Sequence, residues 1–399
     1  MVDIPLGLPK DVDKYFYNRE KELITLNSIV NTLNQNISNQ ILVTGLRGVG
    51  KSFLLKKLMT TIPKNILVSY IDISNIYGAG KSNLTEEDIL YGLLSEMNNS
   101  LQSNEKIYKK TYKKIHIQIK NLLSKLKTND YTFNDNETIF SIPIPQITEN
   151  YKKLSDFVFN FPQEVVNTSK GKINGFIIII DEFQLIGELK NVDAFFWLIR
   201  SFTQKQDNVT YIFTGSTSTT SEMVEKLNGS SGAFGQRMIQ FNIEPFSKET
   251  SKNYLKEKIP EINFTDDGFE RFYSCTRGYP ANINSFCNVM SSNIIYGDKE
   301  VIKEFYNKLD QIAVKWISIW SSLNKKEKEI ITTLIDNESI KWKDLAKYVS
   351  FSQATLTTNV KKLKNKGLIS NFNKLYKIED FMLSAWLKHR KKEDGFYPL

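Results

Sequence analysis

The chain has 399 residues, of which 41% are hydrophobic and 24% charged, so we expect a folded protein of two or three domains. No apolar run approaches the roughly 20 residues of a membrane helix, residues 1–10 do not resemble a secretion signal, and two cysteines are too few for a disulfide framework. We therefore expect a cytoplasmic protein without membrane contact. The net charge of +9 is uneven, because residues 320–399 carry +7 and the other 319 residues carry +2. This surplus indicates a polyanion partner or a solubilising surface.

Apolar periodicity predicts the first half of the fold. Apolar residues at helical spacing indicate a helix over 23–33, and a second helix is expected from Lys51 to Thr60. Short apolar runs alternate with these helices, and the run at 176–180 is typical of a central parallel strand. The pattern predicts an α/β fold with a parallel sheet and helices on both faces. With the motif of residues 45–52, described next, it predicts a P-loop NTPase core. The predicted strands are 41–43, 66–72, 176–180 and 209–214.

A phosphate-binding motif lies between the first predicted strand and the helix after it. Residues 45–52 read Gly-Leu-Arg-Gly-Val-Gly-Lys-Ser, which matches G-x-x-x-x-G-K-[ST] at every fixed position. The glycines let backbone N–H groups face one point, and the helix adds its positive end. Lys51 is expected to contact the β- and γ-phosphates of ATP, and Ser52 to ligate Mg²⁺. The residues predicted to bind the nucleotide are Gly45, Arg47, Gly48, Val49, Gly50, Lys51 and Ser52.

A long segment, about residues 76–170, separates the second and third predicted strands and is interpreted as a helical insertion. It contains a predicted helix over 86–97, and the prolines within 141–145 exclude a continuous helix there. Its Lys-rich stretch, 106–127, is interleaved with apolar residues. That stretch is either a solvated amphipathic helix or a contact for nucleic acid or a partner protein.

Two carboxylates follow the most apolar strand. Asp181 and Glu182 stand where that strand leaves the sheet, and ligands of open α/β sheets bind at such carboxyl ends. Asp181 is expected to hold Mg²⁺, and Glu182 to orient and deprotonate the attacking water. Thr214 and Ser216 end the next strand, so their hydroxyls are candidates for contact with the γ-phosphate or the water, or they simply terminate the strand.

The rest of the chain reads as a helical lid, 248–296, a connecting helix, 301–322, and a winged helix. The winged helix is predicted from three helices and a hairpin. Its third helix and wing suit DNA, since short polar side chains can read base edges and lysines can bind phosphates; a purely protein-binding role stays open. The helices are 324–336, 342–349 and 353–366, and the candidate contacts are Ser352, Gln353, Thr355, Thr357, Thr358, Asn359, Lys361, Lys362, Lys364, Lys366, Asn371, Asn373 and Lys374.

Several short motifs, in order, resemble those of one family. The chain is similar to the archaeal-type ATPases of the AAA+/STAND branch of P-loop proteins, including origin-recognition-like ATPases. The resemblance covers about residues 15–390 without the insertion. The motifs are Phe16-Tyr17-Asn18-Arg19-Glu20, Thr214-Gly215-Ser216, Phe234-Gly235-Gln236-Arg237, Ile243-Glu244-Pro245-Phe246 and Arg277-Gly278-Tyr279-Pro280.

This resemblance implies two further site residues. Arg237 would be an arginine finger, although Gln236 intervenes where the family has glycine directly before the arginine, and Arg277 would be a lid sensor. The implied domains are an ATPase core over 1–244, a lid with linker helix over 245–318 and a winged helix over 319–399. The expected function is an ATP-hydrolysing switch that binds duplex DNA, with a homo-oligomer or partner protein possible. The alternatives are a STAND-type signalling ATPase, or the ATPase subunit of a defence or mobile-element system.

Overall fold

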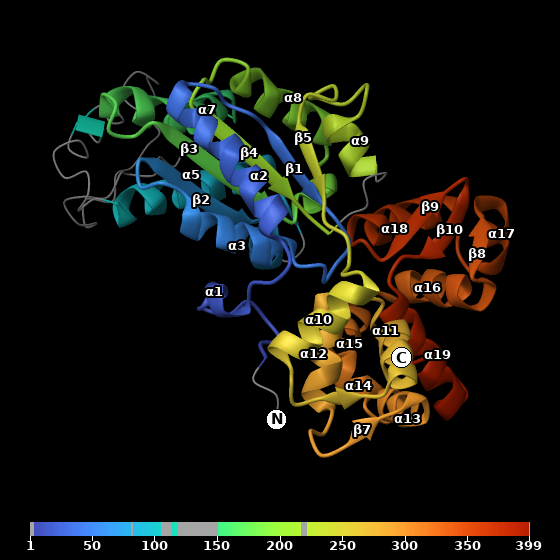
Figure 1. The fold of residues 1–399 in the computed structure, drawn as a ribbon. Helices are drawn as coiled ribbons and strands as arrows, with labels where there is room; N and C mark the ends of the chain where they lie inside the picture. Colours follow the sequence, from blue (N-terminus) through green and yellow to red (C-terminus); the bar gives the residue numbers. More distant parts are fainter. Residues whose placement is uncertain are drawn as a thin grey trace. The chain divides into compact units, whose positions relative to one another are not determined.

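The computed structural model describes residues 4–80, 83–104, 114, 115, 117, 151–216 and 222–398 (Figure 1). Its contacts divide the chain into two compact units. We call Arg19–Thr44 and Leu54–Asn242 the sheet unit, and Met1–Asn18, Gly45–Phe53 and Ile243–Leu399 the helical unit.

The sheet unit is built on five parallel strands in the order β2-β3-β4-β1-β5. The four predicted strands are all present, and the predicted fold class is confirmed. Because every strand runs the same way, their carboxyl ends lie at one edge, where Asp72 pairs with Asp181 and Val43 with Thr214. The strands are β1 (Ile41–Thr44), β2 (Ile66–Asp72), β3 (Gly175–Asp181), β4 (Val209–Thr214) and β5 (Ile239–Asn242).

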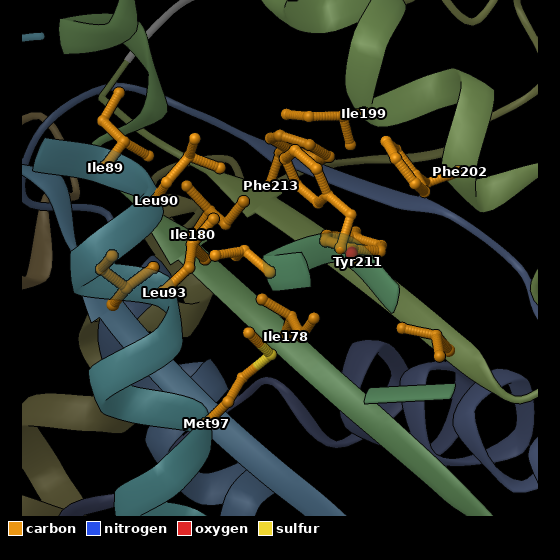
Figure 2. Close-up of a cluster of buried hydrophobic side chains, with 14 of the residues drawn as sticks. Ile89, Leu90, Leu93, Met97, Ile178, Ile180, Ile199, Phe202, Tyr211 and Phe213 are labelled. Atoms are coloured by element: carbon orange, nitrogen blue, oxygen red, sulfur yellow. The ribbon is translucent and has the colours of Figure 1, made fainter. Parts of the chain in front are cut away.

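Alternate side chains of the central strands face one apolar cluster (Figure 2). Ile178 and Ile180 of β3 lie in it beside Tyr211 and Phe213 of β4, as the two-residue period of a strand requires. Two helices cover this face, α5 (Glu86–Ser103) and α8 (Val192–Thr203). The side chains that these helices add to the cluster are at helical spacing: Ile89, Leu90, Leu93 and Met97 of α5, and Ile199 and Phe202 of α8.

The two ends of the predicted insertion belong to this packed core. α5 contacts β2, and α7 (Tyr151–Ser169) contacts α5 and β3 with a fully buried apolar stripe. Most of the Lys-rich stretch and the whole of 141–145 lie outside the described residues. The other elements of this unit are α2 (Glu20–Asn31), η1 (Thr32–Gln35), most of α3 (Lys51–Thr61), α4 (Ile73–Ala79), η2 (Phe183–Glu188) and α9 (Glu222–Asn228).

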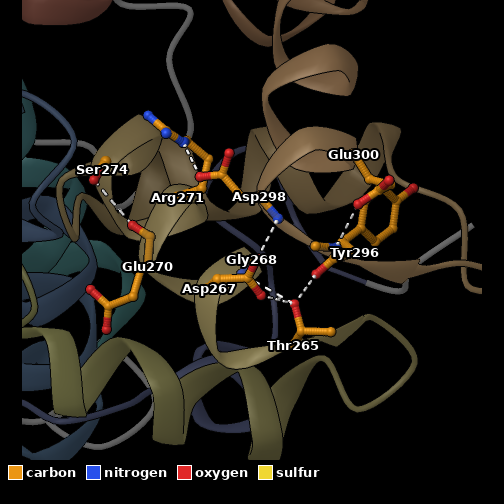
Figure 3. A network of polar contacts seen from close by, with 10 residues as sticks. Thr265, Asp267, Gly268, Glu270, Arg271, Ser274, Tyr296, Asp298 and Glu300 are labelled. Carbon is orange, nitrogen blue, oxygen red and sulfur yellow. Dashed lines mark hydrogen bonds and ion pairs between the residues drawn. The ribbon is translucent and has the colours of Figure 1, made fainter.

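The lid part of the helical unit is tied together by polar contacts (Figure 3). The Thr265 side chain caps α11 by accepting from Gly268 N at 3.2 Å, and Arg271 of α11 binds Asp298 of α13 at 2.7 Å. A short parallel pair, β6 (Asn263–Phe264) with β7 (Ile295–Tyr296), lies beside them. The helices are α1 (Val12–Tyr15), α10 (Lys248–Lys258), α11 (Asp266–Thr276), α12 (Pro280–Val289), α13 (Asp298–Asn307), α14 (Leu309–Ile312) and α15 (Val314–Ser322).

The connecting helix predicted over 301–322 is wrong, because three helices, α13 to α15, occupy this stretch. The backbone leaves helical geometry at Lys308 (φ −111°) and Ala313 (φ −92°). Neither glycine nor proline marks these breaks, so the sequence carries no local signal for them.

The winged helix is present as predicted, with additions. Asn324 and Glu327 form a capping box at the start of α16, and Ser352 caps α18. The wing turns through Asn373 and Lys374, both with positive φ, as a two-residue hairpin loop requires. The elements are α16 (Lys325–Asn337), β8 (Ser339–Lys341), α17 (Trp342–Tyr348), α18 (Gln353–Asn365), β9 (Ile369–Phe372), β10 (Leu375–Ile378) and α19 (Phe381–Asp394), of which β8 and α19 were not predicted.

One hydrophobic core runs from the lid into the winged helix. It includes Phe272 and Phe286 of the lid together with Ile330 of α16 and Trp386 of α19. α15 joins the two regions, with Trp316 and Trp320 both buried in this core, and the boundary predicted at 318/319 falls inside α15. Among the described helices, none is both long and apolar enough to cross a bilayer.

Candidate nucleotide site and winged-helix surface

The P-loop continues directly from β1 and is shaped by its glycines. Gly45, Gly48 and Gly50 have φ of 142°, 88° and 100°. A Cβ on Gly45 would lie 2.4 Å from the Ile243 carbonyl oxygen, and one on Gly48 would lie 3.0 Å from Ala281 Cβ. A side chain at either position would therefore displace the loop or its neighbours.

Lys51 is held by the loop that precedes it. Lys51 is the first residue of α3 and is only 5% exposed. Its Nζ donates to the carbonyl oxygens of Gly45 at 2.8 Å and Leu46 at 3.0 Å. The two bonds direct the ammonium group back over the P-loop. Val49 is buried beneath the loop, while Arg47 and Ser52 are half-buried.

Asp181 and Glu182 occupy the carboxyl end of β3. Asp181 is 4% exposed, and its Oδ2 accepts a hydrogen bond from the Tyr70 hydroxyl of β2. Its Oδ1 accepts from Glu182 N at 2.8 Å. Glu182 has φ of 54°, a left-handed conformation that costs a non-glycine residue energy.

The Glu182 carboxylate is bound on both oxygens. Gln184 Nε2 donates to Oε2, and Ser216 Oγ donates to Oε1 at 3.3 Å. Thr214 is fully buried at the end of β4, and its hydroxyl has no hydrogen-bond partner among the described residues. The ends of β3 and β4 thus bring together Asp181, Glu182, Thr214 and Ser216, as the sequence predicted for one edge of the sheet.

Arg237 lies on a tightly bonded loop of the sheet unit. Backbone bonds join Ala233 N to Lys226 O at 2.9 Å and Gln236 N to Asn228 O at 3.1 Å. Gln236 has φ of 60°, and the Arg237 side chain is exposed, with no ion pair to any described residue. Its role as a finger stays a prediction.

Arg277 caps the carboxyl end of α11 with φ of 51° and lies among groups from three parts of the helical unit. Its guanidinium is 4.5 Å from the ring centroid of Phe381, the first residue of α19, and Tyr279 packs on the same ring at 5.7 Å. In the first turn of α12, Ala281 N donates to the carbonyl oxygen of Gly48 in the P-loop at 3.2 Å.

The residue before Phe381 is Asp380, which caps α19. Burial raises the pKa of this carboxyl to about 6, against the opposing effect of hydrogen bonds from Leu383 and Met382 and the positive charge of Arg47. The lid turn therefore lies beside Gly48 of the P-loop, and Asp380 at the start of α19 lies near Arg47. The sequence did not indicate these contacts.

Part of the predicted DNA surface is exposed on α18 and the wing. The exposed members are Ser352, Gln353, Thr357, Thr358, Lys361, Lys362, Asn371, Asn373 and Lys374, and Thr355 is half-buried.

Two residues proposed for this surface are structural instead. Asn359 is buried and accepts from Asn324 Nδ2 at 3.3 Å, and Lys366 donates to the buried Glu327 at 2.8 Å. Lys364 is half-buried. The periodicity of α18 explains these corrections, since every helix has an inward face.

Comparisons with known proteins agree with this architecture. Residues 16–286 match the family described as ATPase domain predominantly from Archaea, and residues 323–370 match the one described as winged helix-turn-helix DNA-binding. An uncharacterised ATP-binding protein of Methanocaldococcus jannaschii is 28% identical over 300 residues, 72% of this chain and 73% of that protein. A second one from the same organism is 25% identical over 344 residues, 84% of each chain.

Among solved structures, the Walker-type ATPase of Pyrococcus abyssi has the same fold. It superposes with a TM-score of 0.61 at 17% identity, covering 96% of this chain and 99% of that one. Since the archaeal family accounts for well over half of the residues and includes the P-loop and both β3 carboxylates, the chain belongs to the archaeal ATPase domain family and ends in a winged helix.

Proposed function

We propose that the chain binds ATP with Mg²⁺ and hydrolyses it, and that its winged helix binds duplex DNA. The observation that carries the ATP part is the curled P-loop with Lys51 already buried among its own carbonyl groups. The P-loop leaves β1 at the sheet edge where β4 ends in Thr214 and β3 ends in Asp181. Ligands of open α/β sheets bind at such carboxyl ends, so the proposed site takes groups from the P-loop and from these strand ends.

The residues present fit both groups. Backbone N–H groups and Lys51 offer donors for phosphate oxygens, while the buried Thr214 hydroxyl has no described partner. Ser52 and Asp181 are oxygen ligands of the kind that Mg²⁺ prefers, and the bound metal would neutralise charge on the phosphates. Glu182 would orient the attacking water and accept its proton.

Phosphate release from ATP by the purified chain, with Mg²⁺ and with the metal chelated, tests this proposal. We expect release only with Mg²⁺. No release with Mg²⁺, either with or without duplex DNA, would contradict the hydrolytic function.

Arg237 is proposed to act on the γ-phosphate of a nucleotide, in its own chain or in a second copy. Arg237→Ala should leave ATP affinity unchanged and lower turnover about 10- to 100-fold, because a cation near the γ-phosphate stabilises the transition state. Steady-state turnover at several protein concentrations checks this. The matched control is Lys205→Ala, an exposed cation of the same unit. Wild-type turnover of the Arg237 variant at every concentration excludes a finger role.

DNA binding is proposed to use the exposed lysines of α18. Replacing Lys361 and Lys362 together by alanine should make the slope of log affinity against log salt shallower by about 1.8, because each phosphate contact contributes roughly −0.9. Fluorescence anisotropy with a labelled duplex at several salt concentrations measures the slope. The control, Lys299→Ala with Lys303→Ala on α13, removes the same charge from another exposed helix. An equal change in both double variants means that net charge, and not α18, attracts the DNA.

A second candidate function is a signal-transduction ATPase whose winged helix binds protein. The contact of Arg277 with Phe381 favours it, because this contact ties the lid arginine to the C-terminal region. Absence of any salt-sensitive binding to duplex DNA, with or without ATP, would favour this function over the first.

A further inference from the structure

We propose that Gln184 is a positioning residue that fixes the Glu182 carboxylate and influences hydrolysis through it. This inference rests on the proposed ATPase function. Gln184 lies in η2, two residues after Glu182, and is only 2% exposed. Its Nε2 donates to Glu182 Oε2, and no other side chain of the described residues binds that oxygen.

The position of Gln184 is fixed by its neighbours. Glu182 is the N-cap residue of η2 and has a left-handed conformation, and Leu185 N donates to Glu182 O at 3.0 Å. Phe183 is fully buried and packs edge-on against Phe213 of β4, with ring centroids 6.2 Å apart. These contacts turn the Gln184 side chain back toward the end of β3.

The amide also reaches the end of β4. A Cβ on Gly215 would lie 2.0 Å from Gln184 Oε1, so the amide rests directly against the Gly215 backbone. The next residue, Ser216, donates to the other oxygen of Glu182. One carboxylate is thus held by donors from two elements, η2 after β3 and the segment after β4, which restricts its rotation.

Packing alone does not account for an amide at this place. Gln184 Oε1 is buried without a hydrogen-bond partner among the described residues, and burying an unpaired polar atom is unfavourable. An apolar side chain of similar length would fill the space without that cost. The donation to Glu182 is the interaction that such a replacement would lose.

A fixed carboxylate suits a general base. An ionised carboxylate has about four lone-pair sites, so one donor on each oxygen leaves sites for a water. Small displacements of a catalytic group lower the rate strongly, by about 100-fold for 1 Å. Gln184 lies outside the P-loop, so its loss should act on hydrolysis and spare nucleotide affinity.

The test compares Gln184→Met with Gln206→Met. Gln206 is a matched control because it is also buried, donates one bond, to Phe159 O at 2.5 Å, and has an unpaired Oε1. We expect the single-turnover rate of ATP hydrolysis to fall about tenfold in Gln184→Met, with ATP affinity within about twofold of wild type. Gln206→Met should keep the wild-type rate even if it lowers the melting temperature equally.

A double-mutant cycle decides whether Gln184 acts through Glu182. In the Glu182→Gln background, Gln184→Met should cause no further loss, because the base is already absent. A further tenfold loss, an accelerated reaction in the single variant, or a rate like that of Gln206→Met would each overturn the inference. If Glu182→Gln itself hydrolyses normally, the proposed function fails instead.

Ser216→Ala keeps the inference testable if Gln184→Met does not fold. This variant removes the donor to the other carboxylate oxygen without enlarging a side chain. We expect a several-fold lower single-turnover rate that again disappears in the Glu182→Gln background. An unchanged rate in Ser216→Ala would contradict positioning of Glu182 by these two donors.

Discussion

Replacing Lys51 by alanine should abolish tight ATP binding. The ammonium of Lys51 is buried and already bonded to the Gly45 and Leu46 carbonyl groups, so it is directed before any ligand arrives. The bond of such a cation to a phosphate is charge-assisted, and no other lysine follows the loop within the same turn of α3. We expect affinity to fall at least about 100-fold, which corresponds to about 2.7 kcal/mol.

Isothermal titration with ATP and Mg²⁺ measures this loss directly. Thermal unfolding supplies an independent measure, since a ligand at 100 times its Kd stabilises the native state by about 2.7 kcal/mol and the variant should lose that gain. Lys57→Ala is the control on the same helix, and it should bind ATP like wild type. Equal affinity of the Lys51 variant and wild type would place the nucleotide elsewhere.

Replacing Glu182 by glutamine should keep ATP bound and slow its hydrolysis about 100- to 1,000-fold. Glutamine retains the size of the side chain and still accepts a hydrogen bond, but it does not take a proton from water, and general bases contribute about 10²- to 10⁴-fold. Glutamine also keeps an oxygen to accept from Gln184 or Ser216, so the local structure should persist.

Rapid-quench single-turnover kinetics separates this effect from product release. The expected result is a slow chemical step with unchanged ATP affinity, and a stable ATP complex that can be isolated. Glu188→Gln, at the end of the same 3₁₀ helix, controls for loss of a nearby charge. A chemical step as fast as wild type assigns the base role to another group.

The central parts of the fold were predictable because their signals are local. The P-loop motif is contiguous, and the five isoleucine and phenylalanine residues of 176–180 require burial on both faces. β5 was missed because it is an edge strand in which half-buried and exposed residues alternate, with Gln240 and Asn242 among them. α7 was missed because Pro162 interrupts its pattern, although the structure accommodates it within the helix.

The contacts of the site depended on distant residues and were not predictable. Gln184 is only two residues from Glu182 in sequence, but their bond depends on the left-handed backbone of Glu182 and on the space that Gly215 leaves after β4. Tyr70 reaches Asp181 only because β2 and β3 pair in register. Asn359 and Lys366 appear as free polar groups in the sequence, whereas both bind side chains of α16 or its cap.

The shared core of the helical unit joins the lid and the winged helix into one packed body. Closely packed protein interiors have low compressibility. Trp316 and Trp320 of α15 are both buried in the shared core, so we expect this helix to resist bending. A rotation of the lid turn at Arg277 is then passed to α18 through the same angle, and the displacement grows with distance from the axis. A movement of the lid turn beside the P-loop would then be accompanied by a movement of the wing.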